Sequence, residues 1–92
     1  MNRVERAMVE KNLDLLFEFE RYIAEHPSSA TRIPRNATVV LQVKGDEAFN
    51  RWSRRIGETQ ARKAGGSIVE VRIGRLGPVR SRIQALQISQ AA

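Results

Sequence analysis

The sequence predicts a small α/β fold, a two-layer α-β-α-β sandwich built on a parallel βαβ unit. Three observations predict it. Apolar residues recur at helical spacing in residues 3–25 and again in residues 46–64. β-Branched and apolar residues cluster in residues 38–43 and alternate with charged ones in residues 67–73. A strand, a long helix and a second strand in this order favour a right-handed parallel crossover. We therefore expect one domain over residues 1–92, with residues 74–92 as an extended or partly disordered tail.

The first element is a helix over residues 3–25, and it carries more apolar surface than one core face needs. Charged side chains occupy much of the side opposite its broad apolar face. A second apolar stripe, Val9, Leu13 and Phe17, runs along the flank at a spacing of four. Either this stripe is ordinary core around a central helix, or it is a self-association surface. Pro27 ends the helix, because the residue before a proline is pushed out of the α region. The broad face comprises Val4, Met8, Leu15, Leu16, Phe19, Tyr22 and Ile23.

A loop over residues 28–36, with Pro34 and Asn36 as turn signals, leads to the first strand at residues 38–43. Asp46 is a suitable N-cap for the second helix, which presents Phe49 and Trp52 on one face and runs to about Ala64. The pair of glycines at 65–66 ends this helix. In the second strand, residues 67–73, apolar and charged residues alternate. We expect residues 39, 41 and 43 to share a face with residues 69, 71 and 73, covered by both helices.

Two parallel strands alone make a poor sheet, so a third strand is expected. The tail is one source, because residues 86–89, Leu-Gln-Ile-Ser, suit a short edge strand. A second chain that pairs along the open sheet edge is the other source.

Positive charge is concentrated in the second half of the chain. Residues 1–50 hold seven basic and eight acidic side chains, whereas residues 51–92 hold nine basic and two acidic ones. If the arginines of the second helix and of the segment after the second strand converge, they form a cationic patch with sequence-independent affinity for nucleic acid. The candidate patch comprises Arg51, Arg54, Arg55, Arg62, Arg75, Arg80 and Arg82.

No catalytic, metal or cofactor site is expected from the residues. The chain has no cysteine, which removes disulfides, thiolate metal ligands and a thiol nucleophile. His26 is the only histidine and most simply caps carbonyls at the end of the first helix. No uninterrupted apolar run is longer than that of residues 39–41, so neither a membrane span nor a signal peptide is expected. We expect a cytoplasmic protein.

Several segments resemble a family of small uncharacterised prokaryotic proteins of unknown function. The resemblance rests on residues 17–23 (Phe-Glu-Phe-Glu-Arg-Tyr-Ile), His26-Pro27, residues 33–40 (Ile-Pro-Arg-Asn-Ala-Thr-Val-Val), residues 49–52 (Phe-Asn-Arg-Trp) and residues 80–83 (Arg-Ser-Arg-Ile). It covers most of the chain and implies a stand-alone domain. It implies no reaction, ligand or catalytic residue.

These observations favour a non-catalytic protein-interaction module that forms a homodimer or binds a partner protein through the first helix and an open sheet edge. The alternative is a nucleic-acid-associated protein that uses the arginine-rich surface. An enzyme would need a pocket lined by carboxylates from two chains.

Overall fold

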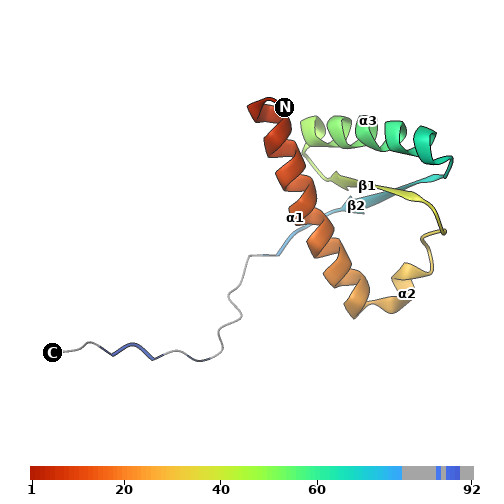
Figure 1. The fold of residues 1–92 in the computed structure, drawn as a ribbon. Coiled ribbons are helices and arrows are strands. Elements are labelled where there is room, and N and C mark those ends of the chain that lie inside the picture. Colours follow the sequence, from red (N-terminus) through yellow and green to blue (C-terminus); the bar gives the residue numbers. More distant parts are fainter. Residues whose placement is uncertain (78–84, 86, 90–92) are drawn as a thin grey trace.

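A computed structural model describes residues 1–77, 85 and 87–89. Its elements are α1 (Arg3–Glu25), α2 (Pro27–Ala30), β1 (Thr38–Val43), α3 (Glu47–Ala64) and β2 (Ile68–Ile73). The two strands form a parallel sheet, so the predicted α/β fold with a parallel βαβ unit is confirmed. Figure 1 shows α3 lying along this sheet and α1 crossing it at a steep angle. None of the described helices is long and apolar enough to cross a membrane.

The ends of the long helices follow from local hydrogen bonding. The Asn2 side chain accepts a hydrogen bond from the Glu5 backbone N–H and so caps α1. Asp46 caps α3 in the same way by accepting from the Phe49 backbone N–H, as predicted. Gly65 closes α3 in the left-handed conformation, with φ of 75°.

The connection after α1 differs from the expected loop, because residues 27–30 form the short helix α2. Pro27 is the cause of both features. It ends α1 at Glu25, because His26 directly before it is pushed out of the α region. It also occupies the first turn of α2, where its missing N–H has no intrahelical partner to lose.

The sheet register confirms that the two apolar sets share one face. Val39 lies beside Val69, Leu41 beside Val71 and Val43 beside Ile73. We call this side of the sheet the α1 face, because α1 packs on it. We call the opposite side the α3 face. The candidate third strand at residues 86–89 lies partly outside the described residues. Those of its residues that are described, 87–89, are in no strand.

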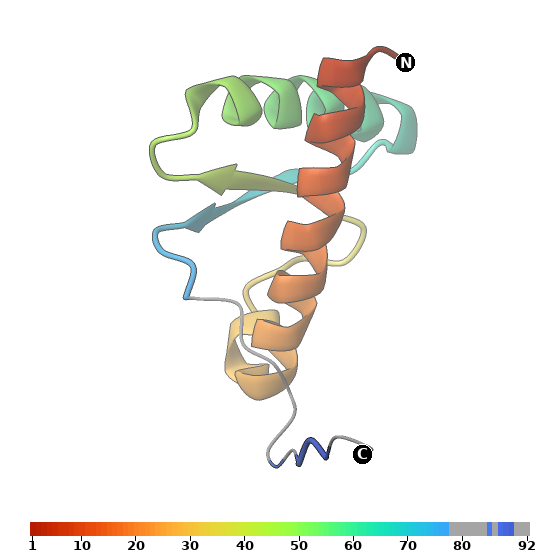
Figure 2. The same cartoon turned by 90° about the vertical axis from the view of Figure 1, so that its left-hand side faces the viewer.

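The core lies between α1 and the sheet and is centred on Leu15, Leu41 and Phe49. Figure 2 shows α1 passing in front of both strands. The expectation that both helices cover this face holds only for the beginning of α3, which contributes Phe49 and Trp52. Further along α3, a Cβ atom on Gly57 would lie 2.2 Å from Val40 Cγ2. Because Val40 points to the α3 face, the middle of α3 packs on the side of the sheet opposite α1.

The two strands are buried to very different extents. Val40, Leu41 and Gln42 of β1 are buried, whereas along β2 the residues alternate between exposed and half-buried. β2 is therefore an edge strand whose apolar side chains are only partly covered by the described chain.

Candidate interaction surface

Among the described residues, no strand pairs with the outer edge of β2, which we call the open edge. On the inner edge, Thr38 N–H donates to the Ser67 carbonyl and Lys44 N–H donates to the Ile73 carbonyl. Successive residues of a strand direct their backbone groups to opposite edges, so residues 67, 69, 71 and 73 face β1. The N–H and C=O groups of Ile68, Glu70 and Arg72 consequently point away from β1, toward the outside of the sheet. Such a row of backbone groups is a template for an additional strand.

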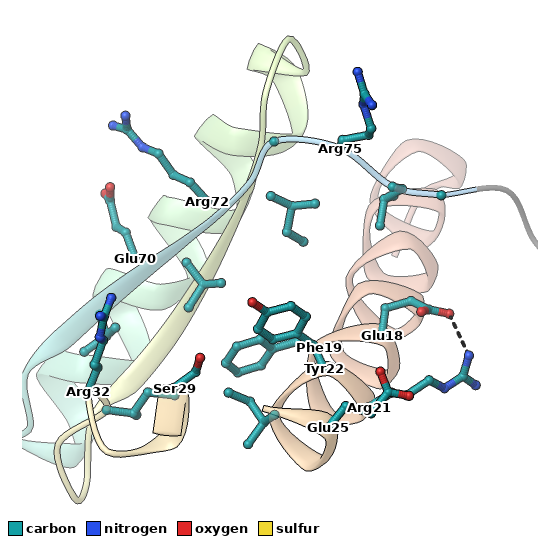
Figure 3. A pocket seen from close by; sticks show the side chains of 18 residues that line it. Glu18, Phe19, Arg21, Tyr22, Glu25, Ser29, Arg32, Glu70, Arg72 and Arg75 are labelled. Carbon is teal, nitrogen blue, oxygen red and sulfur yellow. Dashed lines mark ion pairs between the residues drawn. The ribbon is translucent and has the colours of Figure 1, made fainter. Parts of the chain in front are cut away.

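A groove of about 610 Å³ lies beside this edge. One wall is the second half of α1, another is β2 with residues 74–77, and Ser29, Arg32 and Ile33 close the end. Figure 3 shows the aromatic rings of Phe19 and Tyr22 in its centre, with Glu70 and Arg72 projecting together from β2 away from it. The groove thus combines an apolar lining with charged residues around it. The apolar lining comprises Phe19, Tyr22, Ile23, Ile33, Val69, Val71, Ile73 and Leu76.

Two ion pairs involve residues that line the groove, one on each face of the sheet. Arg21 and Glu18 lie one turn apart on α1, with Arg21 Nη1 3.7 Å from Glu18 Oε1. On the α3 face, Arg54 reaches from α3 to Glu70, with Nη2 and Nε at 2.8 and 3.1 Å from the same carboxylate oxygen, Oε1. Glu70 therefore has a second oxygen, Oε2, that makes no hydrogen bond within the described part of the chain.

The stripe predicted for self-association is a separate surface. Val9 is half-buried, but Leu13 and Phe17 are 49% and 65% exposed. Neither lines the groove. Phe17 lies five residues before Tyr22, about 140° around the helix at 100° per residue. α1 therefore carries an apolar flank, on the side away from the groove, that the described part of the chain leaves exposed.

The predicted basic residues occupy two regions in the structure. Arg51, Arg54 and Arg55 are exposed on α3 and line a shallow hollow together with Glu47 and Glu58. Arg62 is exposed near the end of the same helix, whereas Arg75 lines the groove beside α1. Arg80 and Arg82 lie outside the described residues. The structure therefore brings three of the seven arginines together and mixes them with acidic side chains.

His26 lies at the end of α1, where the sequence places it as a cap. Its Nδ1 donates to the Tyr22 carbonyl at 3.0 Å, and its backbone N–H donates to the same oxygen. The His26 and Tyr22 rings stack, with their centroids 4.0 Å apart. His26 thus contacts the ring of Tyr22, which lines the groove. Among the described residues, no cluster of three or more His, Asp or Glu side chains has the arrangement of a metal site.

Sequence reasoning missed the groove and one residue that holds the sheet in place, Asn50. Its side-chain oxygen accepts from the Val43 N–H at 2.7 Å, and its amide donates to the Val43 carbonyl at 2.9 Å. This pair of bonds closes the end of the outer edge of β1. The available signal was an asparagine inside a helix, where its intrinsic propensity is poor.

Lys11 joins α1 to the beginning of α3 through an ion pair with Asp46. Two hydrogen bonds lower the pKa of Asp46 below its ordinary value of 3.8. The one from Lys11 has the larger effect, and the one from the Phe49 N–H has the smaller. A carboxylate with a lowered pKa contributes stability above its unfolded pKa and loses it as the pH falls through the folded one.

Replacing Asp46 by asparagine should isolate this ion pair, because asparagine is an equally good N-cap but carries no charge. We expect the wild type to be more stable at pH 7 by less than about 1 kcal/mol, since both partners are partly exposed. The difference should shrink once the pH falls below about 3.8 and vanish when Asp46 is protonated in the folded state. Urea unfolding of both proteins across pH 2–7 measures it. A difference that persists unchanged into acid would contradict this account.

Comparison with known proteins identifies the family to which this sequence belongs. No curated protein and no solved structure matches the chain. The sequence model of a family of unknown function, DUF5647, matches residues 7–86. This range contains most of α1, α2, both strands and α3, and with them the groove, the stripe and the Asn50 contacts. The chain therefore belongs to the DUF5647 family of unknown function.

Proposed function

We propose that this protein is a non-catalytic protein-interaction module that associates with a second copy of itself. The observation that carries the proposal is the apolar flank of α1, where Leu13 and Phe17 are exposed although other apolar residues of the same helix, among them Leu15 and Phe19, pack in the core. Burying one phenylalanine side chain is worth about 1.5–3 kcal/mol. A symmetric contact between two copies buries two such side chains, one from each copy.

Two further features support an interaction role. The open edge of β2 and the apolar groove beside it are a second surface that a partner can cover. In addition, a chain of 92 residues buries a modest fraction of its surface on folding, so association adds substantially to its stability.

The variant Phe17→Ser should weaken self-association at least about tenfold, because it removes the most exposed large apolar group of the stripe. Val4→Ser is the matched control, since Val4 is exposed on α1 to the same 65% as Phe17 but lies on the other side of the helix. Sedimentation velocity across a concentration series measures the dissociation constant of each. If both substitutions weaken self-association equally, the stripe has no specific role. A wild-type protein that stays monomeric at about 100 μM would overturn self-association itself.

Nucleic-acid binding is the competing outcome. The exposed arginines of α3 support it, whereas Glu47 and Glu58 in the same hollow and the Arg54–Glu70 ion pair weaken the local positive charge. Phosphate-driven binding is strongest at low salt. Affinity for duplex or single-stranded probes at ~50 mM salt that is lost in the variant Arg51→Gln with Arg55→Gln would favour that role over the one proposed.

A further inference from the structure

β2 has a charge pattern that is complementary to itself when the strand is reversed. Residues 69–73 are Val-Glu-Val-Arg-Ile, with Val71 in the middle, an acid on one side and a base on the other. In an antiparallel pair of two such strands centred on Val71, each Glu70 lies opposite an Arg72. Each Val69 likewise lies opposite an Ile73. Opposite charges and apolar pairs directly across an antiparallel ladder stabilise it, and like charges destabilise it.

The backbone restricts the possible registers. The groups free to bond at the outer edge belong to Ile68, Glu70 and Arg72, so an antiparallel partner must place even-numbered residues opposite even-numbered residues. Among the symmetric registers that satisfy this, those centred on residues 70, 71 and 72 place the charged side chains of β2 opposite one another. The first puts Glu70 opposite Glu70, and the last puts Arg72 opposite Arg72. Only the register centred on Val71 pairs opposite charges.

We propose that the open edge of β2 binds β2 of a second copy, antiparallel and in register about Val71, so that two sheets join into one of four strands. This inference rests on the proposed self-association and names a contact separate from the stripe. In this arrangement Glu70 and Arg72 exchange both backbone hydrogen bonds with the partner's Arg72 and the partner's Glu70. The two-fold axis is perpendicular to the sheet, so each side chain meets the partner's on the same face.

The surroundings of β2 fit such a partner on both faces. On the α3 face, Glu70 binds Arg54 through Oε1, and its other oxygen is available to the partner's Arg72. On the α1 face, the half-buried Val69, Val71 and Ile73 line the groove. The incoming strand brings the same three apolar side chains into that groove. Each copy thus covers the surface that the other leaves partly exposed.

A single engineered thiol tests the register directly, because the natural chain has no cysteine. Residue 71 lies on the two-fold axis as a non-hydrogen-bonded pair, with Cα atoms about 4.5 Å apart, which is within disulfide range. Val71→Cys should therefore form a disulfide-linked dimer under mild oxidation. Val69→Cys is the matched control. In the proposed register residue 69 lies opposite residue 73 of the second copy, so the two thiols at position 69 would be four residues apart along the ladder and this variant should stay unlinked. Val71→Cys should also crosslink when combined with Phe17→Ser.

Charge reversal gives an independent readout. Glu70→Arg and Arg72→Glu each create two like-charge pairs in the homodimer, so each should raise its dissociation constant at least about tenfold. An equimolar mixture of the two variants pairs arginine with glutamate at all four positions and should associate like the wild type. Because Glu70→Arg also breaks the pair with Arg54, Arg54→Gln is the control and should have a smaller effect on association.

The outcomes separate the two proposals. A wild-type monomer overturns self-association and this contact with it. A wild-type dimer whose Val71→Cys variant does not crosslink, and whose charge-reversed variants associate normally, overturns the β2 contact alone. Weakening by only one of the two reversals would also overturn it, because the register centred on Val71 places each of these two residues opposite the other and makes both reversals equally repulsive. Thermal unfolding followed by circular dichroism verifies that each variant is folded.

Discussion

Replacing Phe49 by alanine should lower the free energy of unfolding by about 3–5 kcal/mol, the usual cost of removing a buried aromatic side chain. Phe49 is 0% exposed and lies at the junction of α1, α3 and the sheet. Its ring packs against Trp52, with centroids 5.9 Å apart, and Lys11 Nζ lies 5.3 Å from its centroid. A domain of this size has few other large buried groups. The loss is therefore a large fraction of a total stability on the order of 5–15 kcal/mol.

Two comparison variants make this prediction specific. Phe49→Leu keeps most of the apolar volume but removes the ring contacts, so it should cost less than alanine, under about 1.5 kcal/mol. Phe17→Ala removes the same ring from an exposed position and should change the unfolding of the isolated chain by less than about 0.5 kcal/mol. Urea unfolding at equal, low protein concentration measures all three. A similar cost for Phe17→Ala and Phe49→Ala would contradict the described core.

Local sequence patterns predicted the elements well because their signals lie in adjacent residues. The boundaries of α1 follow from the helical spacing of apolar residues and from Pro27, and those of α3 from Asp46 and Gly65. The shared face of the two strands follows from alternation combined with the parallel crossover. The stripe was also predictable, since a spacing of four places Leu13 and Phe17 on one flank whatever the tertiary structure.

The features that sequence analysis missed depend on contacts between distant segments. Nothing near Gly57 indicates that it lies against Val40, and therefore nothing indicates that α3 crosses to the opposite face of the sheet. The groove needs α1, α2 and β2 together. The arginines illustrate the same difficulty, because their spacing along α3 was readable but the acidic residues among them and the separate location of Arg75 were not.

Asn50 is the clearest example of such a contact, and its removal has the second large expected effect. Asn50→Ala should destabilise the chain by about 2–4 kcal/mol, because it leaves the Val43 N–H and C=O without partners at a partly buried strand end. The higher helix propensity of alanine offsets only about 0.5 kcal/mol of this cost. The loss should be seen in urea unfolding as a lower midpoint with an unchanged slope.

The two hydrogen bonds of Asn50 can be separated by substitution. Asn50→Asp keeps an acceptor for the Val43 N–H but cannot donate to the Val43 carbonyl at neutral pH, so its cost should also be substantial. Asn12→Ala is the control, since Asn12 is also half-buried inside a helix and has no side-chain hydrogen bond among the described residues. It should be neutral or slightly stabilising. If Asn50→Ala were equally neutral, α3 would not be held to β1 by this contact.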